Sequence, residues 1–353
     1  MPNRRFVLKK IFISIMAVFF ISVFIFSCSK SNDEEFIEIT VSDHNPEVVD
    51  PGQALNFWGK WIEEQSEGRV KVTVHHNGAL LKANEVYSGV QEGIADAGYY
   101  ALDSREGFIL NLIIELPFMG WPSQVATVKI YEELMEKFPE IRSEWKGVKL
   151  IGFMMMPGTH IHTVNKEIIT PDDLKGIKIH ASEAMLANAI SSVGATPVTI
   201  NVEDLYMSLE RGLVNGVINH FNMIKAFGAL DLPKYHTIFG DGGINMIPMA
   251  LIMNIDKYNS LPPEIQKIIE NSRQPWIDKF AELDKATQIA TINSVKEMNH
   301  KITYLTADQK NTWHNAVKET LLDKWINNAE NKGLPGKAVY EETLKLINKY
   351  QGQ

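Results

Sequence analysis

The chain has 353 residues, of which 45% are hydrophobic and 22% are charged, and its formal net charge is −8. This length and composition are typical of a globular protein with room for two domains. Affinity for nucleic acid depends on Lys and Arg neutralising phosphates, so an acidic chain without a basic run is not predicted to bind nucleic acid.

The first 27 residues differ from the rest of the chain. Basic residues near the start precede an apolar run from Ile11 to Phe26, a pattern typical of a secretory signal peptide. The alternative is an uncleaved membrane anchor, for which this run is slightly short. We therefore expect residues 1–27 to be a signal peptide and the remainder to be exported.

Cys28, the only cysteine, directly follows this run. The small residue Ser27 before it resembles the lipobox of bacterial lipoproteins. The sequence therefore predicts lipidation at Cys28, with residues 28–35 as anchor and linker. The protein would then lie at the periplasmic or cell-envelope face, held to a membrane surface. A single cysteine also excludes a disulfide framework within the chain.

The first lobe is predicted over residues 36–157. A strand is expected at Glu38–Val41, followed by a helix with Asp50 as its N-cap and Pro51 at its first position. Alternating valines over residues 70–74 then predict a half-buried strand.

A helix–glycine–strand pattern occurs twice. Six positions separate Tyr87 from Gly93, and six separate Tyr206 from Gly212. Such a pattern can recur in any α/β protein, but it can also mark two lobes that each contain the same βαβ-like unit. We favour two lobes.

The second half of the chain predicts a crossing to another lobe and a return. A strand over residues 148–156 is nearly continuous in apolar residues, as expected for burial on both faces, and Pro157-Gly158 ends it. From Pro275 to about His300 no Gly or Pro intervenes, which predicts a helix about 37 Å long. The expected segments are lobe II over 158–246, a return to lobe I over 247–274, and a spanning helix with C-terminal helices over 275–353.

Candidate ligand residues lie where strands end. His180, Asn219 and Asn222 fall at or just past predicted strand ends, and ligands of open α/β sheets bind outside the carboxyl ends of strands. In the first half, Tyr99 follows a predicted strand and His44 lies in the loop after the first one. Either residue can equally belong to the core or be a structural residue.

Motifs of enzymes are missing. The sequence has no H-E-x-x-H, C-x-x-C, P-loop or G-x-S-x-G motif, which argues against an enzyme and predicts no cofactor. His160 and His162 share a face of an extended strand, and His180 could approach them. A zinc site of a metal-dependent enzyme is therefore an alternative, although no metal is predicted, because no carboxylate or thiol lies nearby at ligand spacing.

Several short motifs occur in a fixed order. They are P-G-x-x-I-H-T at 157–163, D-L-K-G-I-K-I at 173–179 and G-A-T-P-V at 194–198, with G-I-A-D-A-G at 93–98 and E-L-P-F at 115–118. With this order, the chain from about residue 70 to 264 resembles the DctP-type solute-binding proteins of tripartite ATP-independent periplasmic (TRAP) transporters.

This resemblance implies an α/β fold of the periplasmic-binding-protein type, with two lobes, a long helix spanning both lobes and a helical C-terminal tail. It also implies that a small organic acid is captured between the lobes and delivered to the membrane permease subunits of a TRAP transporter, with no catalytic role.

One residue departs from the family pattern. The family usually has an Arg after the D-L-K-G-x-K-I motif, which holds the ligand carboxylate in a bidentate fork. This chain has His180 there. Either His160 shares the carboxylate, or the ligand is not a simple carboxylate. The resemblance also implies ligand contact for Asn219, and Phe221 just beyond it could form an apolar wall. A sensor subunit that signals to a membrane receptor is a further alternative.

Overall fold

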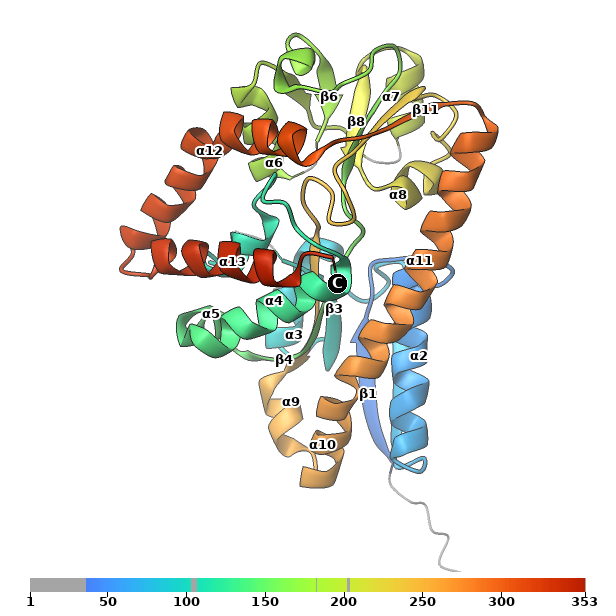
Figure 1. The fold of residues 1–353 in the computed structure, drawn as a ribbon. Coiled ribbons are helices and arrows are strands. Elements are labelled where there is room, and N and C mark those ends of the chain that lie inside the picture. The colour runs from blue at the N-terminus through green and yellow to red at the C-terminus, as the bar shows by residue number, and fades with distance from the viewer. Residues whose placement is uncertain (1–35, 103–106, 182, 202–203, 353) are drawn as a thin grey trace, which may run out of the picture. The chain divides into compact units, whose positions relative to one another are not determined.

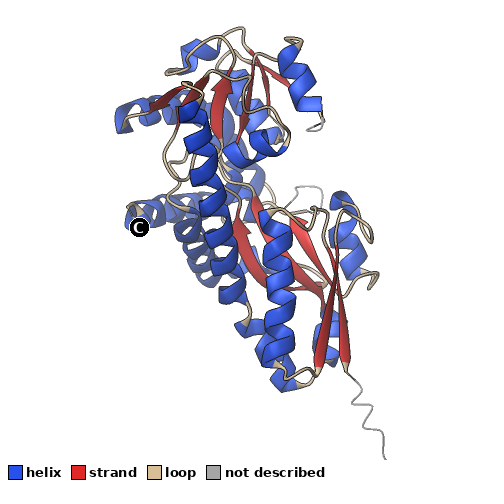
Figure 2. Ribbon diagram, turned by 90° about the vertical axis from the view of Figure 1, so that its right-hand side faces the viewer, coloured by secondary structure: helices blue, strands red, loops and turns tan. Residues whose placement is uncertain are grey.

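The computed structural model describes residues 36–102, 107–181, 183–201 and 204–352. The predicted signal peptide and the predicted lipid-anchor residue Cys28 with its linker lie outside these residues. The described chain forms two mixed β-sheets with helices packed on them, which is an α/β architecture (Figure 2).

The first sheet, sheet A, has five strands in the order β2-β1-β3-β10-β4. Strands β1 and β3 are parallel, whereas β10 runs antiparallel to both β3 and β4. Every residue of β10 is buried, as expected for a central apolar strand. The strands are β1 (Ile37–Ser42), β2 (Val70–His75), β3 (Ala97–Ala101), β4 (Val148–Met155) and β10 (Pro248–Asn254).

The second sheet, sheet B, has six strands in the order β11-β9-β5-β8-β6-β7. Strand β5 is antiparallel to β8 and β9, whereas β6 is parallel to β7 and β8. The strands are β5 (His160–Thr163), β6 (Lys178–His180), β7 (Thr196–Val198), β8 (Gly216–Asn219), β9 (Tyr235–Ile238) and β11 (Lys301–Tyr304). We call sheet A with its helices lobe I and sheet B with its helices lobe II.

The helices connect these strands and form the C-terminal tail (Figure 1). The short Pro171–Leu174 segment is a 3₁₀-helix with Thr170 as its N-cap residue. The α-helices are α2 (Asp50–Gln65), α3 (Val86–Gln91), α4 (Gln124–Lys137), α5 (Pro139–Ser143), α6 (Ala184–Ser192), α7 (Leu205–Glu210), α8 (Phe221–Ala226), α9 (Ile255–Ser260), α10 (Pro263–Asn271), α11 (Arg273–Glu297), α12 (Ala307–Glu330) and α13 (Gly336–Tyr350).

The repeated sequence pattern forms the same unit in each sheet. Helix α3 precedes strand β3 in sheet A, and helix α7 precedes strand β8 in sheet B, each joined through a glycine with positive φ. After each glycine, a polar side chain accepts a hydrogen bond from the backbone N–H of the neighbouring parallel strand. Asp96 accepts from Thr40 at 2.8 Å, and Asn215 accepts from Lys178 at 3.3 Å. Asp96 and Asn215 each lie three positions after that glycine, so the spacing that the two units share has a structural cause.

Helix α11 spans the two lobes. It contacts α2 and β4 of lobe I and α8 of lobe II, and its course past these elements is visible in Figure 1. Its buried side chains recur at helical spacing, with Trp276, Phe280, Asp284 and Thr291 among them. The tail also contacts both lobes, because α12 packs against α6 and α13 packs against α4.

Two chain segments that link the sheets touch closely. The segment from β4 to β5 contains Gly158, and the segment from β9 to β10 contains Gly242. A Cβ atom at Gly158 would lie 2.5 Å from the backbone carbon of Gly242, so this approach requires glycine.

Two expectations about individual elements are wrong, and one strand was not predicted. Asp50 begins helix α2 but does not cap it, because its carboxylate instead accepts a hydrogen bond from Thr287 of α11 at 3.0 Å. Tyr99 lies within strand β3 rather than after it. Strand β11 was not expected, since a four-residue strand with exposed ends has too short a pattern to distinguish from a loop.

Candidate functional site

Three of the predicted ligand residues lie on one face of sheet B. His160 pairs with Asn219 across the antiparallel strands β5 and β8, and His180 pairs with Val217 across the parallel strands β6 and β8. Paired residues point to the same face, and Val217 and Asn219 share a face because they are two positions apart. The fold therefore brings His160, His180 and Asn219 together near the carboxyl ends of β6 and β8.

His180 is fully buried at the end of β6. Its Nδ1 donates a hydrogen bond to the backbone oxygen of Val198, 3.1 Å away. Its Nε2 is buried and finds no hydrogen-bond partner within the described part of the chain. Buried polar atoms nearly always have a partner, so this nitrogen is a candidate to meet a ligand.

Asn219 ends strand β8 with both of its oxygens occupied. The side-chain oxygen accepts from the backbone N–H of His220 at 2.9 Å, and the backbone oxygen accepts from His162 Nε2 at 3.0 Å. Phe221, next along the chain, belongs to the lobe II core and packs its ring 4.7 Å from the His162 ring.

A chain of three histidines, buried His162 and His236 and half-buried His300, supports this strand end. His162 Nδ1 lies 2.7 Å from His236 Nδ1, and His236 Nε2 lies 3.2 Å from His300 Nδ1. Lys234 Nζ lies 3.2 Å from His300 Nε2. Because the Asn219 backbone oxygen can only accept, neutral rings satisfy every link when each donates towards Asn219. The chain thus fixes the position of the Asn219 backbone.

The electrostatic environment keeps these rings neutral. Burial, with the neighbouring His220, lowers the pKa of His160 to about 3. Burial lowers the pKa of His220 to about 4, and burial with the neighbouring His300 lowers that of His236 to about 3. Burial also lowers the pKa of His162 well below its usual range. His160 is therefore a poor charged partner for a carboxylate.

Metal binding is not supported by the arrangement of these residues. His160, His162 and His180 do share a sheet face, but no three His, Cys, Asp or Glu side chains in the described chain are placed to hold a metal ion.

His44 and Tyr99 meet in lobe I. Their rings stack with centroids 5.8 Å apart, and a hydrogen bond links His44 to the Tyr99 backbone. His44 Nδ1 is buried with no hydrogen-bond partner among the residues that the structure describes, and burial lowers the pKa of His44. Tyr99 is almost fully buried, and its hydroxyl points to the sulfur atoms of Met154 and Met156.

Asn222 connects lobe II to the spanning helix. Its Nδ2 donates to Asp284 Oδ1 at 2.9 Å, while its Oδ1 is buried and has no donor in the described chain. Burial, together with the charge of Asp50, raises the pKa of Asp284 to about 6, against the opposing effect of hydrogen bonds from Gln288, Gln124 and Asn222. Asp284 was not among the residues predicted from the sequence. Its helical spacing from Trp276 and Phe280 on the buried face could have identified it.

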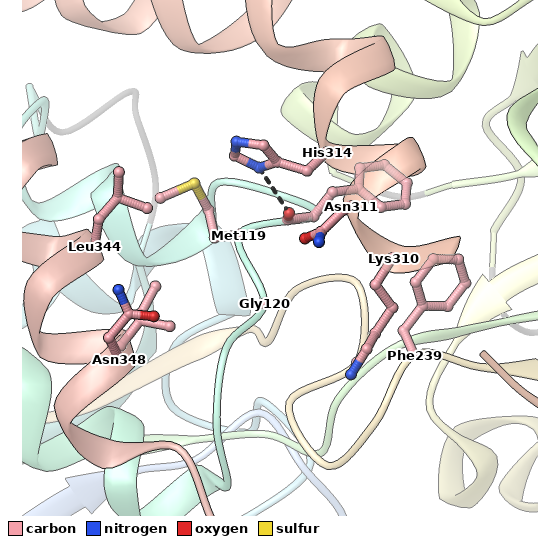
Figure 3. A pocket seen from close by; sticks show the side chains of 11 residues that line it. Met119, Gly120, Phe239, Lys310, Asn311, His314, Leu344 and Asn348 are labelled. Atoms are coloured by element: carbon pink, nitrogen blue, oxygen red, sulfur yellow. Dashed lines mark hydrogen bonds between the residues drawn. The ribbon is translucent and has the colours of Figure 1, made fainter. Parts of the chain in front are cut away.

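A separate cavity of about 210 Å³ lies between the tail helices and two loops (Figure 3). The side chains of Lys310 and His314 come from α12, and His314 Nδ1 donates to the Phe118 backbone oxygen at 3.0 Å. None of the predicted ligand residues lines this cavity, nor the cavities of about 270 Å³ beside Trp145 and about 430 Å³ beside Met207.

No helix in the described part of the chain is both long enough and apolar enough to cross a membrane.

Comparison with known proteins agrees with this architecture. The chain is 21% identical over 297 residues to the 2,3-diketo-L-gulonate-binding periplasmic protein YiaO of Escherichia coli, covering 82% of this chain and 85% of the relative. It is 24% identical over 253 residues to the ectoine-binding periplasmic protein TeaA of Halomonas elongata, covering 69% and 71%. A TRAP periplasmic solute binding protein from Desulfovibrio salexigens superposes with a TM-score of 0.81 at 24% identity, covering 90% of this chain and 97% of that one.

A family model described as bacterial extracellular solute-binding protein, family 7 (DctP), matches residues 41–328. The family and the structural neighbours are solute-binding receptors of TRAP type, not enzymes. The chain belongs to this DctP family of extracellular solute-binding proteins.

Proposed function

We propose that this protein captures a small organic acid between lobes I and II and delivers it to the membrane subunits of a TRAP transporter. One observation carries the proposal. Three residues predicted to bind ligand, His44, His180 and Asn222, each hold a buried polar atom that has no hydrogen-bond partner among the described residues. Leaving such an atom unpaired costs about 1–3 kcal/mol, which a ligand's hydrogen bonds would recover.

The two lobes contribute different groups. Lobe II supplies the His180 ring and Asn222, with Asn219 held in place beside them, and lobe I supplies His44 stacked on Tyr99. A protonated His180 would donate to a carboxylate through Nε2, whereas a neutral His180 would accept from a hydroxyl or amine there. The relatives that bind diketo-L-gulonate and ectoine support a small polar ligand.

A thermal-shift screen of the purified protein at pH 6 and pH 8 tests this function. The panel contains mono- and dicarboxylates, sugar acids, aromatic acids, and neutral and amine solutes. A ligand present at 100 times its dissociation constant stabilises the folded protein by about 2.7 kcal/mol. No saturable binding across the panel would overturn the proposal.

His180→Gln tests the role of this side chain directly. We expect roughly tenfold weaker binding of the solute identified in the screen, because the neutral Gln amide replaces a charge-assisted hydrogen bond at this position with a weaker one. The control is His75→Gln, at a half-buried position in the edge strand β2. Equal effects of the two substitutions would remove His180 from the site.

Delivery and membrane attachment need separate tests. Uptake into vesicles that contain the permease subunits should require this protein, whereas binding without uptake would favour the sensor alternative. Anchoring at Cys28 predicts that Cys28→Ser moves the protein from the membrane fraction to the soluble fraction. Unchanged fractionation would contradict the anchor.

A further inference from the structure

Asp284, in the middle of helix α11, is a buried carboxylate without a cationic partner. Asp284 is only 1% exposed to solvent. It accepts hydrogen bonds from Asn222 Nδ2 at 2.9 Å and from Gln288 Nε2 at 2.8 Å, both neutral donors. In the described part of the chain, no Lys, Arg or His forms an ion pair with it. Buried charges in proteins are usually paired, so this one requires an explanation.

The position of Asp284 places it between the lobes. Gln124, at the start of α4 in lobe I, donates to its carboxylate, and Gln124 Nε2 also donates to the backbone oxygen of Met155, the last residue of β4. Asn222 reaches the same carboxylate from lobe II. The charge of Asp284 contributes to raising the pKa of Tyr99, so its field extends to the predicted wall in lobe I.

A second observation points to a ligand at this place. Asn222 uses Nδ2 to donate to Asp284, and its Oδ1 is a fully buried acceptor for which the described chain provides no donor. His180, fully buried at the end of the strand next to β8, likewise has an unpartnered Nε2. The Asp284 carboxylate and Asn222 Oδ1 can only accept hydrogen bonds. A protonated amine suits them because it supplies several N–H donors and a positive charge.

We propose that Asp284 and Asn222 Oδ1 form a subsite for a protonated amino group of the ligand. This inference rests on the proposed function and narrows it, because the solute would then be an organic acid that also carries an amine. In this arrangement the acid group lies towards His180, and the amino group lies towards helix α11.

The electrostatics favour such a ligand over a simple acid. Asp50 of α2 acts on the same carboxylate, and no Lys, Arg or His of the described residues forms an ion pair with either acid. Burial and the neighbouring charge thus raise the pKa of Asp284 to about 6. A second anion would be repelled by an ionised Asp284, whereas an ammonium group would stabilise its charged form. Asp284 would thus make the protein prefer acids that carry an amino group over acids that do not.

Matched sets of solutes test the subsite. Each set contains an amino acid, the same acid without its amino group, and the same amine without its carboxyl group, for example leucine, 4-methylpentanoate and 3-methylbutylamine, with parallel sets for phenylalanine and glutamate. Titration calorimetry at pH 8 should show at least one amino acid binding roughly 10-fold to 100-fold more tightly than its acid without the amine.

Two substitutions at the subsite and one control complete the experiment. Asp284→Asn and Asn222→Ser should each reduce the preference for the amino acid by roughly tenfold. Asp278→Asn, an exposed position on the same helix, should leave the preference unchanged.

The outcomes separate this inference from the function on which it rests. If acids without an amine bind as tightly as the amino acids, and Asp284→Asn changes neither, the amine subsite is wrong while the receptor function stands. If no solute of any class binds, both are overturned.

Discussion

Asp284→Asn should stabilise the unliganded protein at neutral and alkaline pH. The pKa of Asp284 is raised from 3.8 to about 6, chiefly by burial. A carboxyl group that holds its proton more tightly in the folded chain than in the unfolded chain favours folding at low pH. It opposes folding once the pH rises through the folded pKa. Asn has nearly the same shape and no charge.

The expected magnitude follows from this pKa. A change from 3.8 to about 6 corresponds to about 3 kcal/mol of unfolding free energy at pH 8, where the group is ionised in both states. Part of this gain is lost because one donor, from Asn222 or Gln288, must turn to match the new amide, at a cost of about 1 kcal/mol. The net gain of about 2 kcal/mol should raise Tm by about 3–6 °C.

Thermal unfolding from pH 8 to pH 4 measures the effect. The difference in Tm between Asp284→Asn and the natural protein should be largest at pH 8. It should shrink as the pH falls through the folded pKa of about 6 and close only near pH 4, where the pH approaches the unfolded pKa of 3.8. Asp278→Asn, exposed on the same helix, should show neither effect. A constant difference at all pH values, or a less stable Asp284→Asn at pH 8, would refute the burial argument.

Two further predictions concern the histidines and the linking segments. His160, His220 and His236 have lowered pKa values in the folded chain, so below about pH 6.5 protons bind preferentially to the unfolded chain. The free energy of unfolding should therefore be unaffected above about pH 6.5 and fall by about 1–2 kcal/mol per histidine by pH 5. An unfolding midpoint in urea that stays constant from pH 7 to pH 5 would contradict this. Gly158→Ala should lower stability by about 1–3 kcal/mol, because its Cβ would lie 2.5 Å from the Gly242 backbone, and an unchanged midpoint in urea would show that the linking segments can separate.

The sequence was sufficient to predict the parts of the fold that depend on local pattern. The repeated spacing from Tyr to Gly predicted one βαβ-like unit per lobe, and both units form. The absence of Gly and Pro predicted the long helix, which spans Arg273–Glu297. Short motifs in a fixed order indicated the family. These features involve residues near one another in the chain.

Features that depend on distant residues could not be read from the sequence. Asp50 resembles an N-cap, but Thr287 of α11 draws its carboxylate away, and these positions are 237 residues apart. Asp284 is a charged residue within a helix, and only the packing of α4 and α8 around it shows that it is buried. Strand β11 exists because β9 pairs with it, not because four residues have a strong strand pattern.

The contacts of the lobe II histidines also depend on distant residues and could not be read from the sequence. The structure distinguishes these histidines by their hydrogen bonds. In the chain from His300 through His236 to His162, each neutral ring donates one hydrogen bond and accepts another, so no nitrogen remains for a ligand. A proton added to any link would place two donors face to face, which agrees with burial keeping these pKa values low. His180 lies outside this chain: Val198 occupies its Nδ1 and its Nε2 is left over. Substituting His236 should therefore loosen the Asn219 backbone without removing a ligand contact, whereas substituting His180 should remove one.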